Sequence, residues 1–118
     1  MIFKIDVKQQ SNSAKCTITL SFGDEATTGD KIVSEINKIM ADLIASNQIP
    51  GGKIVKIDGP CTVAGAYVIA TWLKPLYGAI AIADPKLRLE DGSNQYIVVV
   101  SRDPYYRVGS VIGPEAEK

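Results

Sequence analysis

Three short stretches of the sequence combine side chains that could bind anions or transfer protons. The first, residues 58–62, joins a predicted strand to a predicted helix and contains Gly59, Pro60 and Thr62. The start of a helix presents free backbone amides and a partial positive charge, and both favour a phosphate group. Most turns of this kind bind nothing, so this stretch indicates an anion site only together with the other two.

The second stretch follows a predicted buried strand, at the kind of strand end where α/β proteins collect ligands. Residues 84–88 read Asp-Pro-Lys-Leu-Arg, which places the carboxylate of Asp84 beside the cations Lys86 and Arg88. Such a group could hold a metal or a phosphate. An Asp before a Pro is also ordinary turn chemistry, so a solvated turn is the alternative interpretation.

The third stretch, residues 101–107, places Arg102 and Arg107 on either side of two tyrosines. Arginine forks match phosphate oxygens, and a ring such as that of Tyr105 stacks on nucleobases. The alternative is a surface loop in which Tyr105 or Tyr106 packs on the core.

Histidine is absent from the chain, which excludes a Ser-His-Asp or Cys-His pair and an imidazole base near neutral pH. Cys16 and Cys61 lie far apart in apolar settings, so we expect two buried thiols in a reducing compartment rather than a zinc site or a disulfide. The 13 basic and 13 acidic residues cancel, which argues against a general DNA or RNA coat but leaves room for a small anionic ligand. No apolar run approaches the roughly 20 residues that span a bilayer, and no secretory leader is evident, so we expect a cytoplasmic protein without membrane contact.

Hydrophobic periodicity predicts the elements that must position these residues. Alternation at period two predicts a hairpin from the first two strands, helical spacing predicts two helices, and apolar or β-branched runs predict three more strands. The expected strands are 2–7, 16–22, 53–57, 79–83 and 95–101, and the expected helices are 32–44 and 63–73. We therefore expect one α/β (α+β) domain over residues 1–118, a ferredoxin-like two-layer sandwich in the order ββαβαββ.

The predicted helix 63–73 is apolar almost all round, which is typical of a helix buried on several sides. Its own sheet can bury one side, and a second subunit could bury another.

The second half of the chain resembles the CRISPR-associated Csx-three family, also described as ring nucleases. The resemblance rests on Gly59-Pro60, on a segment ending in Leu76-Tyr77-Gly78-Ala79-Ile80-Ala81, on Asp84-Pro85-Lys86-Leu87, and on a valine-rich strand followed by Tyr106-Arg107-Val108-Gly109. It implies a ferredoxin-like homodimer, with cyclic tetra-adenylate, the second messenger of type III CRISPR defence, sandwiched between two dimers. It also implies ring cleavage supported by manganese, and exonuclease activity on RNA tails.

The sequence departs from that family at its histidines. Thr71 and Pro75 stand at the two helical positions, and Arg102 stands where a further histidine follows the valine-rich strand. Asp84 and Lys86 are kept, as the acidic and basic members of the second motif. General acid–base catalysis is worth roughly a hundred- to ten-thousand-fold in rate, whereas binding by phosphate contacts and stacking needs none of it.

We therefore predict a protein that holds the ring through Gly59, Pro60, Thr62, Thr71, Arg88, Arg102, Tyr105 and Arg107, and damps the signal by sequestration or slow cleavage. An active ring nuclease using Asp84 and Lys86, and a non-catalytic dimerisation or scaffold domain, stay open as alternatives.

Overall fold

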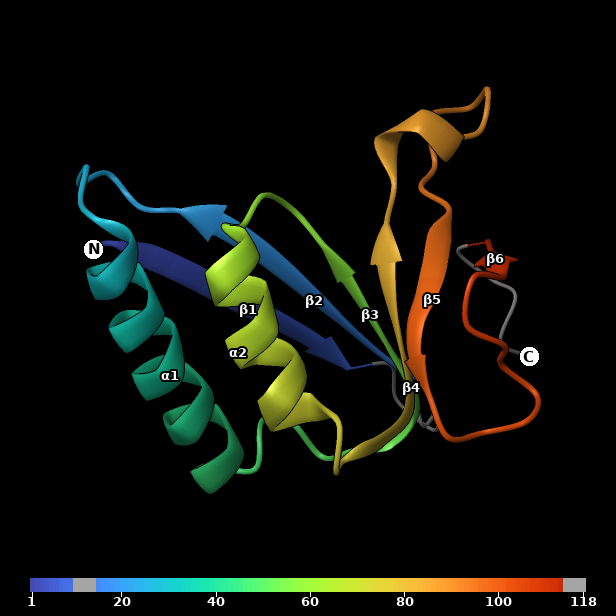
Figure 1. The fold of residues 1–118 in the computed structure, drawn as a ribbon, viewed down its shortest axis with the longest axis horizontal. Coiled ribbons are helices and arrows are strands. Elements are labelled where there is room, and N and C mark those ends of the chain that lie inside the picture. Colours follow the sequence, from blue (N-terminus) through green and yellow to red (C-terminus); the bar gives the residue numbers. More distant parts are fainter. Residues whose placement is uncertain (10–14, 114–118) are drawn as a thin grey trace.

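The computed structural model describes residues 1–9 and 15–113. The elements follow one another along the chain as β1 (Phe3–Gln9), β2 (Lys15–Phe22), α1 (Gly29–Ala45), β3 (Gly52–Asp58), α2 (Val63–Leu73), β4 (Tyr77–Ala83), the 3₁₀ turn η1 (Pro85–Leu87), β5 (Tyr96–Ser101) and β6 (Val111–Ile112). Within the described residues, the six strands form one sheet, and both helices lie on the same face of it (Figure 1). The predicted mixture of helices and strands is confirmed.

The strand order is sequential, from β1 at one edge to β6 at the other. β1 and β2 form the predicted antiparallel hairpin, whose turn lies outside the described residues. β2, β3 and β4 are parallel, each joined to the next by a helix, and β5 and β6 return antiparallel. The ferredoxin-like order ββαβαββ is not confirmed, because a further strand follows β5 and every strand pairs with its neighbours in the sequence.

Two apolar cores lie on opposite faces of the sheet. The larger one fills the space between the sheet and the two helices, where α1 contributes Ile32, Ile36 and Met40 at helical spacing. The smaller one, around Val98 and Tyr106, lies under the segment that follows β5. Because the apolar residues of α1 face the larger core, their helical spacing in residues 32–44 correctly predicted this helix.

Of the two sides of α2 that were expected to be buried, one by its own sheet and one by a second subunit, the single chain buries one. In the single chain, α2 buries Gly65, Ile69 and Leu73 along one side, while Val63 and Tyr67 are 76% and 74% exposed. Figure 1 shows that α2 covers the middle of the sheet, so that its neighbour on the other side is the β4–β5 part of the same face, which has no helix over it. An apolar helix side and an apolar strip of sheet are therefore both left open.

Cys16 is buried and Cys61 is half-buried, and both are free thiols. Burial raises the pKa of each thiol, because the charged thiolate is poorly solvated there. None of the described helices is long and apolar enough to span a membrane.

Candidate functional site

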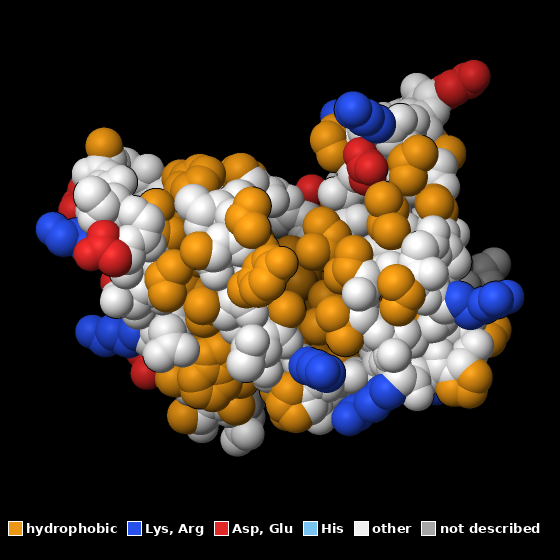
Figure 2. Space-filling model, viewed as in Figure 1, with side chains coloured by type: hydrophobic (Ala, Val, Ile, Leu, Met, Phe, Trp, Pro, Cys, Tyr) orange, Lys and Arg blue, Asp and Glu red, His pale blue; other side chains and the backbone are white. Residues whose placement is uncertain are grey.

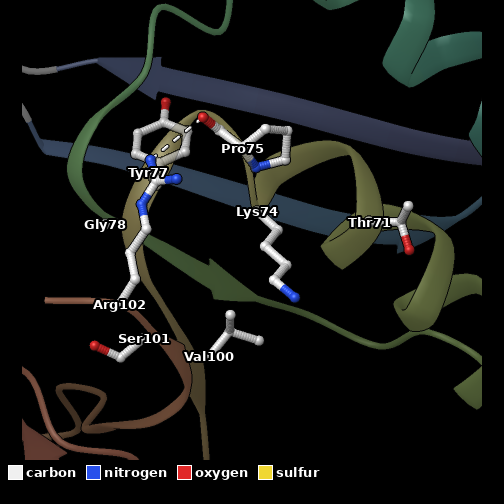
Figure 3. Close-up of a pocket in the computed structure, with 8 residues that line it drawn as sticks. All are labelled: Thr71, Lys74, Pro75, Tyr77, Gly78, Val100, Ser101 and Arg102. Carbon is white, nitrogen blue, oxygen red and sulfur yellow. Dashed lines mark hydrogen bonds between the residues drawn. The ribbon is translucent and has the colours of Figure 1, made fainter.

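A cleft lies between the carboxyl end of α2 and the paired strands β4 and β5. It encloses a cavity of about 470 Å³, lined by Thr71, Lys74, Pro75, Tyr77, Gly78, Val100, Ser101 and Arg102. Figure 3 shows Lys74 pointing from the end of α2 toward Val100 on β5, and Arg102 reaching from the end of β5 toward Pro75 and Tyr77. Two cations and three hydroxyl-bearing side chains thus line one open cavity.

Local structure places the two residues that α2 contributes. Thr71 and Lys74 are three residues apart, so they lie on the same helix face, one turn from each other. The hydroxyl of Thr71 donates a hydrogen bond to the carbonyl of Tyr67 at 2.8 Å, which leaves its oxygen as an acceptor toward the cleft. The amide of Lys74 donates to the carbonyl of Ala70 at 2.8 Å and fixes the start of its side chain.

Arg102 is held from both ends. Its backbone amide donates to the carbonyl of Gly78 at 2.9 Å, and its guanidinium nitrogen Nη2 donates to the carbonyl of Pro75 at 3.3 Å. The second bond uses one of the five guanidinium N–H donors, so the group is oriented while most of its donors remain for a ligand. Such an oriented fork matches the oxygens of a phosphate.

An apolar groove continues from this cleft along the length of α2; we call it the α2 groove. Its middle is a cavity of about 500 Å³ that shares Thr71, Lys74 and Val100 with the cleft and adds Tyr67, Ile82 and Val99. Its far end is a cavity of about 220 Å³ that reaches Gly59 and Thr62, at the amino end of α2. Figure 2 shows hydrophobic side chains gathered in this hollow, with basic side chains below it.

The turn at the amino end of α2 uses several of the amides that sequence reasoning assigned to an anion. Gly59 donates to the Asp58 carboxylate at 2.8 Å, and Gly65 donates to the Thr62 hydroxyl at 3.0 Å, so that Thr62 caps α2. Gly59 has a φ of 104°, and a Cβ there would stand 2.0 Å from the carbonyl oxygen of Leu20. The close approach of β2 therefore accounts for this glycine without a ligand.

Asp84, Lys86 and Arg88 lie at the other end of β4 from the cleft. The Asp84 carboxylate accepts a hydrogen bond from the Lys86 amide at 2.9 Å, which is the turn chemistry that the Asp-Pro alternative predicts. Arg88 donates to the side chain of Asn94 at 3.3 Å, and Asn94 donates to Asp58 at 2.8 Å. The seven residues of β4 separate Asp84 from the cleft by about 20 Å.

The third predicted stretch is divided between two places. Arg102 lines the cleft, whereas the segment after it turns over the opposite face of the sheet, where Tyr106 is buried in the smaller core. Tyr105 packs edge-on against Tyr106, with ring centroids 4.9 Å apart, yet is 73% exposed, and Arg107 is exposed. The part of this stretch that follows Arg102 is thus a surface loop with one tyrosine packed on the core, as the alternative interpretation predicts.

Sequence reasoning missed Lys74, Tyr67 and Ser101 as lining residues. Lys74 and Tyr67 stand three residues after and four residues before Thr71, so helical spacing alone places all three on one face. Ser101 had no comparable signal, because its place beside α2 depends on the pairing of β5 with β4.

The described residues hold no group of three or more Cys, Asp or Glu side chains that could bind a metal ion. We therefore assign no manganese ligands among the described residues, and we derive no step through a metal.

No model of a known protein family matches the chain, and no curated protein or solved structure shows significant similarity to it. The Csx-three resemblance rests on the sequence motifs, and what it implies is taken up as a proposal.

Proposed function

We propose that the chain binds a cyclic oligoadenylate, cyclic tetra-adenylate in particular, and damps this second messenger by sequestration or slow cleavage at an oligomer interface. The observation that carries the proposal is the joining of Lys74 and Arg102 at the mouth of one cleft that opens into an apolar groove. Phosphate oxygens suit the two cations, and bases suit the apolar walls and the exposed ring of Tyr67.

The charge pattern favours a small ligand over a long nucleic acid. The chain is neutral overall, so it offers no broad basic face to displace counterions along a polymer. A cyclic nucleotide needs only a few phosphate contacts, and these two cations can supply them locally. The ring in particular is suggested by the Csx-three resemblance.

Holding is favoured over rapid cutting. The chain has no histidine, and Asp84 and Lys86 stand about 20 Å from the cleft of their own chain. A ring of ribonucleotides carries its own attacking hydroxyl, so a site that only aligns this hydroxyl with its phosphate still accelerates cleavage by positioning.

Titration calorimetry with cyclic tetra-adenylate tests binding, with linear tetra-adenylate as the matched control. We expect heat from the ring at low salt and a weaker response from the linear form, which is not preorganised. The absence of heat with any cyclic oligoadenylate would contradict the proposal and leave the non-catalytic dimerisation domain, which the exposed Val63 and Tyr67 favour.

Incubation of the protein with the ring, with and without manganese, then separates holding from cutting. We expect linear product to form slowly or not at all. Rapid formation would identify an active ring nuclease instead.

A further inference from the structure

The α2 groove is apolar along most of its length and basic at one end (Figure 2). Its middle is lined by Tyr67, Ile82 and Val99, and its far end mostly by aliphatic side chains. Lys74 and Arg102 stand together at the other end, where the groove opens into the cleft. Among the described residues that line these three cavities, none carries a carboxylate. The surface therefore combines a long apolar part with a single positive end.

We propose that the α2 groove binds a long-chain fatty carboxylate, with the aliphatic chain along α2 and the carboxylate at Lys74 and Arg102. Small-molecule sites are concave and mostly apolar, with a few polar groups that fix the orientation of the ligand. This groove has that composition, and its polar groups are cations at one end, which suits a ligand whose only charge is a terminal anion. The inference goes beyond the proposed function and does not depend on it.

The three cavities form one continuous surface. The cleft and the middle cavity share Thr71, Lys74 and Val100. The middle and far cavities share apolar residues of α2, β4 and β5: Ala66, Ala70, Ile82 and Val99. A single chain can therefore run from the cations to the amino end of α2 without leaving apolar surface.

Both cations at the cleft are accessible to a carboxylate. Within the part of the chain that the structure describes, neither Lys74 nor Arg102 forms an ion pair. The bond from Arg102 Nη2 to the carbonyl of Pro75 orients the guanidinium and leaves most of its N–H donors for a ligand. A guanidinium binds a carboxylate through two parallel N–H···O bonds, and Lys74 adds a second positive charge from the end of α2.

The length of the groove sets the length of the chain that it can hold. α2 has 11 residues and therefore extends over about 16 Å. A staggered aliphatic chain with bonds of about 1.5 Å advances about 1.3 Å per carbon, so the groove matches a chain of about twelve to fourteen carbons.

The apolar part of the ligand should supply most of the affinity. Each CH₂ group that is fully removed from water strengthens binding about fourfold, and a groove that is open along one side removes less. An ion pair at an exposed cleft contributes less than the chain does and is weakened by salt. We therefore expect the affinity to depend steeply on chain length and modestly on salt.

A chain-length series tests the proposal. Equilibrium dialysis measures the binding of isotope-labelled saturated carboxylates from about eight to about eighteen carbons, below the concentrations at which they form micelles. The affinity should rise about two- to fourfold for each added carbon and level off near about fourteen carbons, where the chain fills the groove. No binding by any chain, or an affinity that still rises steadily beyond this length, would overturn the proposal.

Ligands of equal length and different charge test the basic end. Dodecanoate, dodecanol and dodecyltrimethylammonium share one aliphatic chain. At low salt, dodecanoate should bind about fivefold more tightly than dodecanol, and the cation should bind most weakly, because Lys74 and Arg102 repel it. Equal affinity for dodecanoate and dodecanol would contradict the placement of the carboxylate at these cations.

A matched pair of valines tests the position of the chain. Val99 lines the middle and far cavities and is 42% exposed, whereas Val111 is 46% exposed on β6 and lines none of the three cavities. Val99→Asp places a charge beside the aliphatic chain and should weaken tetradecanoate binding tenfold or more, while Val111→Asp should bind as the wild type does. Circular dichroism confirms that both variants fold. Equal affinities of the two variants would place the chain outside the groove.

These measurements contain no cyclic oligoadenylate, so they separate this inference from the proposed function. Fatty carboxylate binding by a chain that binds no ring would retain the inference and remove the function, and ring binding without carboxylate binding would do the reverse. If both ligands bind, tetradecanoate should displace the ring, because both use Lys74 and Arg102; this last step rests on the proposed function.

Discussion

The two arginines of the third sequence motif differ in their surroundings although they are five residues apart. Arg102 is oriented in the cleft by its bonds to Gly78 and Pro75, whereas Arg107 is exposed on the loop that covers the opposite face. An oriented cation loses little conformational entropy when it binds a phosphate. The structure therefore separates two residues to which the sequence assigned one role.

Arg102→Ala should weaken binding of cyclic tetra-adenylate by roughly tenfold or more at low salt, since a charge-assisted hydrogen bond contributes about 1.5–3 kcal/mol. The loss should shrink at high salt, because screening already weakens the wild-type contact. Arg107→Ala serves as the matched control and should change the affinity little. Titration calorimetry of both variants at two salt concentrations measures this, and an equal loss in both would place the ring elsewhere.

The two helices begin differently although both follow a threonine. Thr62 accepts a hydrogen bond from the Gly65 amide, whereas the Thr28 side chain makes no capping bond to α1 and donates instead to Asp30. Only α2 therefore depends on its preceding side chain to satisfy an amide of its first turn.

Thr62→Ala should destabilise the protein by about 1 kcal/mol, which corresponds to a melting temperature lower by about 4 °C. Thr28→Ala, the matched substitution at α1, should cost clearly less, because no capping bond is lost. Thermal unfolding followed by circular dichroism compares the two variants. A larger effect at Thr28 would show that the Thr62 bond does not stabilise α2.

An element could be predicted from the sequence where its hydrophobic pattern lies within its own segment. Periodicity predicted α1, α2 and strands β1 to β5, because alternation and helical spacing are written within each segment. β6 was missed because two residues carry no periodicity. The cleft was found only in part, since Thr71 and Arg102 meet through the pairing of β5 with β4, and no local pattern specifies that pairing. The apolar composition of α2 predicted a side that its own sheet leaves open, but it did not predict which strands the helix covers.

At the scale of the whole molecule, the larger core encloses ionisable groups that resist losing their protons. The phenol of Tyr77 is 2% exposed, and burial, with the Cys16 thiol beside it, raises its pKa well above its usual value. Burial raises the pKa of Cys16 in the same direction. In the unfolded chain both groups recover ordinary pKa values, about 8.5 for the thiol and about 10 for the phenol. The folded state then keeps protons that the unfolded state releases.

The free energy of unfolding should therefore fall as the pH rises above about 9, where the unfolded chain begins to ionise and the folded chain does not. Each such group contributes up to about 1.4 kcal/mol per pH unit until the pH reaches its folded-state pKa. Tyr77→Phe removes one of the two groups, so its stability should decline less steeply between about pH 10 and 11. Tyr105→Phe, at an exposed ring, should follow the wild type. Urea unfolding across this range measures the slopes, and identical slopes for wild type and Tyr77→Phe would show that this phenol ionises as readily in the folded core as in the unfolded chain.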